Sequence, residues 1–141
     1  MPRTCIVVAE QSRARFFLQE KKGGKLNETA DLINENARLL EQDLVSDRPG
    51  RSFDIMGSGR HAMESKSSAK KQAATRFAME ICDYLEKTTG TFENLVIVSS
   101  PTFLSLLRKK MPDSIAKLVS KEFKKNLVQK DAGDIEQILN K

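Results

Sequence analysis

The spacing of apolar residues changes along this chain, from short runs typical of strands to the longer period typical of helices. Residues 4–9 form a continuous and largely β-branched apolar run, which predicts a strand buried on both faces. Residues 13–20 and 25–33 are expected to be two further strands, joined by a turn at Gly23 and Gly24. Together these three segments predict an antiparallel meander.

Strands and helices alternate in the second half of the chain. Residues 69–87 place apolar side chains on one face at helical spacing, and Ser67 or Ser68 is expected to cap this helix at its N-terminus. Residues 95–98 form the clearest strand, which is expected to be central and parallel to the first. The other expected elements are a helical turn at 34–40, helices at 101–110, 113–120 and 131–140, and a strand at 123–128.

This order of elements predicts an α/β fold in which helices flank a five-stranded mixed sheet, the arrangement called ribonuclease H-like. Right-handed crossovers would lay the later strands parallel to the first. The chain has 141 residues, enough for one hydrophobic core, and two folded units would each be short of apolar material. Residues 1–141 are therefore expected to form a single domain.

A long polar loop, expected at about 43–66, separates the two halves. It is far longer than the roughly 4–6 residues of most connections, and long structured loops in compact domains are usually functional. Its glycines allow close backbone approach to a ligand, and its arginines suit bidentate contacts with phosphate. The residues expected to bind an anion or RNA are Arg48, Arg51, Gly57, Ser58, Gly59, Arg60, His61, Lys70 and Lys71.

Each of these loop residues has a second interpretation. Arg48 and Arg51 can instead bond Asp47 and Asp54 and so stiffen the loop. His61 is the only histidine of the chain, and three roles are open to it: an exposed side chain without function, a contact to phosphate or substrate, or a catalytic base. His61 is the candidate catalytic residue, and catalysis is not favoured.

The charge of the chain is unevenly distributed. The formal net charge is +5, yet residues 27–44 are acidic overall. Residues 45–76 carry seven basic side chains against three acidic ones, and residues 104–130 carry eight against two. Such asymmetry favours an anionic partner, and the alternative for the C-terminal third is a solvated lysine-rich surface.

The predicted strands argue against a two-metal nuclease, because residues 4–9 and 95–98 contain no carboxylate to hold divalent cations. Glu10 and Glu93 flank these strands and are expected to have ordinary surface roles. No metal and no cofactor is expected. The turn at 99–101 is a second candidate anion site, because it joins the end of a parallel strand to the start of a helix.

The expected compartment is the cytoplasm. No run of apolar residues is long enough to span a membrane, and the N-terminal apolar stretch lacks the length and flanking residues of a signal peptide. Cys5 and Cys82, the only cysteines, are expected to be buried thiols, which suits a reducing environment. A homo-oligomer is compatible with the sequence.

Several segments resemble the bacterial family called "protein required for attachment to host cells". They are EQDLVSDRPGRSFD at 41–54, GSGRHAME at 57–64, IVVAEQSRARFF at 6–17 and LVIVSSPTFL at 95–104. That family is in turn similar to the middle domain of archaeal and eukaryotic class 1 translation release factors. This domain has a ribonuclease H-like fold, and its long loop carries a Gly-Gly-Gln tip that promotes peptidyl-tRNA hydrolysis.

The resemblance implies an intracellular domain that associates with structured RNA or the ribosome. The loop here reads Gly57-Ser58-Gly59-Arg60-His61 and has no Gly-Gly-Gln, so hydrolysis by that mechanism is not expected. Two alternatives stay open: a surface adhesion factor exported without a signal peptide, and a small hydrolase that uses His61.

Overall fold

The chain folds around a five-stranded mixed sheet. This computed structural model describes residues 3–21, 23–37, 39 and 59–139, of which 59–67 are described by their backbone alone. The strands are β1 (Thr4–Ala9), β2 (Arg13–Gln19), β3 (Asn27–Ile33), β4 (Asn94–Ser99) and β5 (Val119–Phe123), in the order β3-β2-β1-β4-β5. The first three strands are antiparallel, whereas β4 is parallel to both β1 and β5. The predicted meander and the central parallel strand are therefore confirmed.

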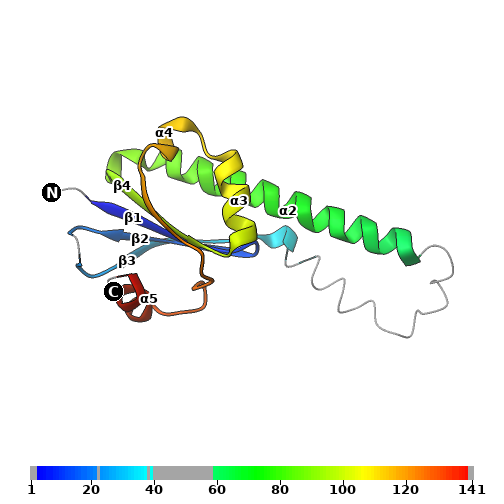
Figure 1. Cartoon of the computed structure of the whole chain (residues 1–141), viewed down its shortest axis with the longest axis horizontal. Coiled ribbons are helices and arrows are strands. Elements are labelled where there is room, and N and C mark those ends of the chain that lie inside the picture. The colour runs from blue at the N-terminus through cyan, green and yellow to red at the C-terminus, as the bar shows by residue number, and fades with distance from the viewer. Residues whose placement is uncertain (1–2, 22, 38, 40–58, 140–141) are drawn as a thin grey trace.

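Helices cover both faces of this sheet (Figure 1). One face carries α2 (Gly59–Lys87), α3 (Pro101–Lys110) and α4 (Asp113–Ala116), and the short 3-10 turn η2 (Thr89–Thr91) joins α2 to β4. The opposite face is covered by α5 (Ala132–Leu139). The sequence-based prediction of an α/β fold with helices on both faces of a mixed sheet is thus correct.

The core follows from the alternation of side chains along the strands. In β1, Cys5 and Val7 point toward the face of α2 and α3, whereas Ile6 and Val8 point toward the face of α5. β4 alternates in the same way, so both central strands are buried on two faces, as their continuous apolar runs predict. Helix α2 packs its predicted apolar face, which includes Phe77, onto the side of the sheet to which Cys5 and Val7 point.

Helix α2 begins earlier than the sequence predicts. Residues 59–66, expected as the end of the loop, are helical, and the predicted caps Ser67 and Ser68 lie inside the helix. The physical reason is composition: after Gly59 no glycine or proline interrupts the chain as far as Lys87, and alanine, methionine, glutamate and lysine favour a helix. The remainder of the predicted loop lies outside the described residues.

The last strand also differs from the sequence-based prediction, since β5 covers Val119–Phe123 rather than 123–128. β5 lies at the edge of the sheet and exposes most of its side chains, so it lacks the apolar run by which the inner strands are recognised. Leu127 and Val128 are buried outside any strand, against the face that α5 covers. The helix predicted at 113–120 is correspondingly shorter, because its last residues join the sheet.

Candidate functional site

A pocket of about 430 Å³ lies where β1 and β4 end. These strands are parallel, and Ala9 is the register partner of Ser99, so the residues that follow them are neighbours. Ligands of open α/β sheets bind at such carboxyl edges. We call this site the carboxyl-edge pocket, and it is lined by Glu10, Gln11, Lys70, Lys71, Ala74, Ser100, Thr102, Phe103, Leu106 and Asn126.

Two lysines of α2 supply positive charge to this pocket. Lys70 and Lys71 are exposed, and among the described residues neither forms an ion pair. They lie just before Ala73 and Ala74, which are the first buried residues of α2 among those whose side chains the structure describes. In Figure 1 the N-terminal half of α2 extends beyond the sheet.

Asn34 holds α2 in place beside the pocket. Its side chain is buried, and Nδ2 donates to the carbonyl oxygens of Gln11, at 2.8 Å, and Ala73, at 3.2 Å. Its backbone N–H donates to the carbonyl of Ser12 at 2.9 Å. One side chain therefore joins the turn after β1 to the helix that carries the lysines. The sequence analysis did not single out Asn34, because no local pattern marks a residue whose partners are distant in sequence.

Among the described residues that line this pocket, Glu10 is the one that carries a carboxylate. One of its carboxylate oxygens accepts a hydrogen bond from Asn126 Nδ2 at 2.9 Å, and the other accepts one from the Ser12 hydroxyl. Glu10 was expected to have an ordinary surface role. Glu93 does have one, since it is exposed and accepts a bond from the Arg3 amide, but Glu10 is half-buried and faces the site.

The N-terminus of α3 forms the remaining wall. Pro101 occupies the first turn, Ser100 precedes it in an extended conformation, and the Ser100 side chain makes no capping hydrogen bond. The N–H groups at the start of a helix lack intrahelical acceptors and carry partial positive charge, which favours a nearby anion. The structure thus brings the predicted turn at 99–101 together with the predicted Lys70 and Lys71.

The other predicted site residues lie elsewhere. Gly59, Arg60 and His61 form the first turn of α2, described by its backbone alone. Arg48, Arg51, Gly57 and Ser58 lie outside the described residues. The anion-binding role of these loop residues and the catalytic role of His61 therefore stay predictions.

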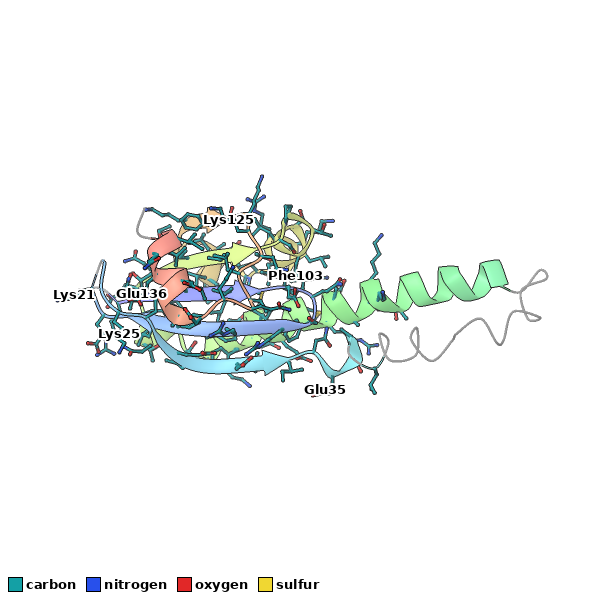
Figure 2. The ribbon with its side chains drawn as sticks, turned by 90° about the horizontal axis from the view of Figure 1, so that it is seen from below. Lys21, Lys25, Glu35, Phe103, Lys125 and Glu136 are labelled. Atoms are coloured by element: carbon teal, nitrogen blue, oxygen red, sulfur yellow. The ribbon has the colours of Figure 1, made fainter. Side chains whose placement is uncertain are left out.

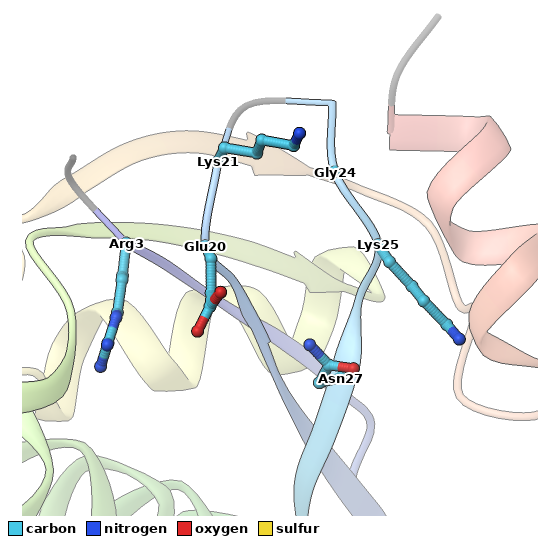
Figure 3. A pocket seen from close by; sticks show the side chains of 6 residues that line it. All are labelled: Arg3, Glu20, Lys21, Gly24, Lys25 and Asn27. Carbon is cyan, nitrogen blue, oxygen red and sulfur yellow. The ribbon is translucent and has the colours of Figure 1, made fainter.

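A second hollow, of about 550 Å³, lies at the opposite end of the sheet, and Arg3, Glu20, Lys21, Gly24, Lys25 and Asn27 line it (Figure 3). Its frame is the predicted turn, in which Gly24 N–H donates to the Lys21 carbonyl at 2.9 Å. Gly23 has a φ of +78°, and a Cβ at Gly24 would approach the Lys21 carbonyl oxygen to 2.9 Å, so both glycines are required.

The cations of this second hollow do not converge. In Figure 3, Lys21 extends across the turn, Arg3 points to one side and Lys25 points to the other, toward α5. Figure 2 shows Lys21, Lys25 and Glu136 together at this end of the molecule, away from Phe103. The carboxyl-edge pocket is the better candidate, because residues of separate elements meet there.

Ion pairs between strands account for two acidic residues of the segment 27–44, Glu28 and Asp31. Arg13 donates to Asp31 and holds the pKa of that carboxyl below its usual range. Arg15 is buried, donates to both carboxylate oxygens of Glu28 at 2.9 and 3.0 Å, and stacks over the ring of Phe17. These acidic groups of β3 therefore neutralise arginines of β2, and among the described residues none of them pairs with Lys70 or Lys71.

The C-terminal basic segment is only slightly compensated. Arg108 donates to Glu122, and this bond lowers the pKa of the Glu122 carboxyl. Among the described residues, the other basic side chains of this segment are exposed and form no ion pair; they are Lys109, Lys110, Lys117, Lys121, Lys124, Lys125 and Lys130. Two of them, Lys124 and Lys125, directly precede the pocket residue Asn126.

Neither cysteine is placed for catalysis. Both thiols are buried, as predicted, and burial raises the pKa of Cys5 to about 12 and that of Cys82 to about 11. In the described part of the chain, no three His, Cys, Asp or Glu side chains are grouped as metal ligands. In the same residues, no helix has both the length and the apolar character needed to cross a bilayer.

The fold and pocket define an α/β protein with a basic site at the carboxyl edge of its parallel strands. A family model described as "Protein required for attachment to host cells" matches residues 5–139. The chain therefore belongs to this family. Comparison with curated proteins finds no significant match.

One solved structure to which the chain is similar is the type II variant of the Aquifex aeolicus Ppx/GppA phosphatase. The sequences are 11% identical, with a TM-score of 0.42, and the match covers 87% of this chain and 36% of that one. The chain thus spans about a third of the length of that protein. A likeness of this extent carries no information about function.

Proposed function

We propose that this host-attachment family protein is an intracellular domain that binds structured RNA, including ribosomal RNA, through the carboxyl-edge pocket and the adjoining part of α2. The observation that carries the proposal is the meeting of Lys70 and Lys71 with the N-terminus of α3 in one pocket. Lysine ammonium groups and helix N-termini both favour phosphate, the group that RNA presents at every nucleotide.

The shape of the molecule supports a macromolecular partner. Helix α2 has 29 residues, a length of about 43 Å at 1.5 Å per residue, and its N-terminal half stands away from the sheet (Figure 1). This half begins at Gly59, Arg60 and His61, so a partner held at Lys70 and Lys71 would lie along the same helix. The resemblance of the sequence to release-factor middle domains is consistent with such a partner.

We also assign the sheet to the ribonuclease H-like arrangement. What supports the assignment is the order β3-β2-β1-β4-β5, with an antiparallel meander followed by two strands parallel to β1. The carboxyl ends of β1 and β4 lie side by side at the centre of this arrangement. The proposed site occupies that position without metal-binding carboxylates on either strand.

The test is the salt dependence of RNA binding. Replacing Lys70 and Lys71 together by glutamine should weaken binding of a structured RNA about tenfold or more at low salt. It should also reduce the magnitude of the slope of log affinity against log salt concentration by about 1.5. Each phosphate contact releases about 0.7–0.9 counterions on binding, and two such contacts would be lost. Fluorescence anisotropy at several salt concentrations measures both quantities.

The matched control replaces Lys109 and Lys110 by glutamine. These two residues lie at the C-terminal end of α3, and their replacement removes the same amount of charge. We expect this pair to change affinity far less. Equal losses in the two double variants would show that net charge alone drives binding, and an unchanged affinity in the Lys70 and Lys71 variant would refute the proposal.

A second candidate function is direct adhesion at the cell surface. The observation that favours it is the description of the family, which refers to attachment to host cells. Under the first proposal the effect on attachment is indirect, whereas under the second the protein itself must be displayed outside the cell.

A further inference from the structure

The carboxyl-edge pocket contains a group that does not suit a simple phosphate site. Glu10 faces the same pocket as Lys70 and Lys71, and a carboxylate repels phosphate. It is also held firmly, because Ser12 and Asn126 donate to different oxygens of its carboxylate. A fixed carboxylate among cations points to a ligand that brings a hydrogen-bond donor as well as a negative charge.

Glu10 retains the capacity to accept such a donor. An ionised carboxylate offers about four lone-pair positions, and the two bonds from Ser12 and Asn126 use one position on each oxygen. The pocket volume of about 430 Å³ lies within the range of sites that hold one small ligand, so it can take one nucleotide of a longer chain. In RNA, the ribose 2′-hydroxyl is a donor that DNA lacks.

We infer that Glu10 accepts a hydrogen bond from the ribose 2′-hydroxyl of one RNA nucleotide in the carboxyl-edge pocket, while Lys70 and Lys71 contact its phosphates. This inference rests on the proposed function and makes Glu10 the residue that distinguishes RNA from other nucleic acids. No bond is made or broken, so the role is one of specificity.

The experiment compares two ligands that differ only in the donor. One is an RNA hairpin, and the other is the same hairpin with 2′-fluoro sugars, which keep the A-form helix but cannot donate. The wild-type protein should bind the RNA about tenfold more tightly than the fluoro hairpin, the effect of one hydrogen bond to a charged acceptor. Glu10→Met removes the acceptor at nearly constant length and should bring the ratio of the two Kd values close to one.

The ratio is the decisive quantity. Removing the negative charge should tighten binding of both hairpins, but this effect is common to the two ligands and cancels in the ratio. Glu10→Asp is the second variant: it keeps the charge and withdraws the acceptor by one methylene, so it should lower the ratio without the common gain. Glu93→Met, at the opposite end of the sheet, is the matched control and should keep the wild-type ratio.

The outcomes separate failure of the inference about Glu10 from failure of the proposed function. Equal Kd values of the wild-type protein for the two hairpins, or a full preference for RNA in Glu10→Met, would overturn the inference about Glu10. In either case RNA binding that still depends on Lys70 and Lys71 would leave the proposed function standing. Failure of the wild-type protein to bind either hairpin would remove both.

Discussion

At the scale of single residues, the site depends on polar side chains that are buried or fixed by distant partners. Asn34 is the clearest case, because its amide group bonds the backbone of both the turn after β1 and helix α2. A buried carbonyl that loses its donor retains the full cost of its removal from water. Asn34 therefore contributes both to stability and to the position of Lys70 and Lys71.

Replacing Asn34 with leucine, which has a similar volume, should lower the free energy of unfolding by about 2 kcal/mol, since two donated hydrogen bonds are lost. Urea titration followed by circular dichroism measures this change. Asn27→Leu, at an exposed position of β3, should stay within about 0.5 kcal/mol of wild type. Similar values for the two variants would contradict the role given to Asn34.

At the scale of elements, Arg15 makes two of the polar contacts that attach the C-terminal segment to the rest of the molecule; Asn126 also bonds Glu10, and Glu136 of α5 accepts from the Leu26 amide at 3.2 Å. Arg15 donates to the backbone carbonyl of Val128 at 3.0 Å and also to that of Lys130, while its other nitrogens bind Glu28. This contact lies just before α5, whose Ile135 is buried against the same face of the sheet. The docking of α5 therefore depends on a charged residue of β2 as well as on apolar burial.

Arg15→Met keeps the apolar stem but removes these bonds, and it leaves Glu28 without its partner. The expected result is a loss of about 2–4 kcal/mol of stability and faster amide hydrogen exchange in α5 than in β1 or β4. Arg13→Met is the control, because its ion pair with Asp31 is largely exposed and should contribute about 1 kcal/mol or less. Unchanged exchange in α5 would show that the helix is held without Arg15, by its apolar packing and the bond from the Leu26 amide to Glu136.

At the scale of the whole molecule, the decisive property is the separation of charge. The acidic residues of β3 are paired with β2, while basic residues of α2 and the C-terminal third stay exposed. An excess of exposed basic side chains favours a large anionic partner and makes the association sensitive to salt. The two candidate functions differ in where the protein must be found, because ribosomes lie inside the cell and adhesion requires display outside it.

Fractionation of cells that express the chain should place it with the ribosome pellet at low salt and in the soluble fraction at high salt. A membrane-impermeant biotin reagent should not label it on intact cells, and a known surface protein and a known cytosolic protein serve as controls. Labelling on intact cells would support direct adhesion, whereas a soluble fraction at both salt concentrations would count against ribosome association.

Much of the fold was accessible from the sequence because it follows from local periodicity. The alternation in β1, the continuous apolar run of β4 and the spacing of apolar residues in the C-terminal half of α2 each reflect burial on defined faces. The errors lie where burial is small. β5 is an exposed edge strand, and the start of α2 projects from the sheet, so neither carries an apolar pattern.

The sequence by itself determined the buried elements, the mixed sheet, the buried thiols and the presence of unbalanced positive charge, because composition and spacing along the chain record them directly. Only the tertiary structure decided which charges remain available. Pairing of β2 with β3 neutralised one set of charges, and the parallel register of β1 and β4 brought Glu10 beside the N-terminus of α3. Contacts between residues far apart in sequence depend on how the helices and strands pack in the tertiary fold, and no local sequence pattern encodes them.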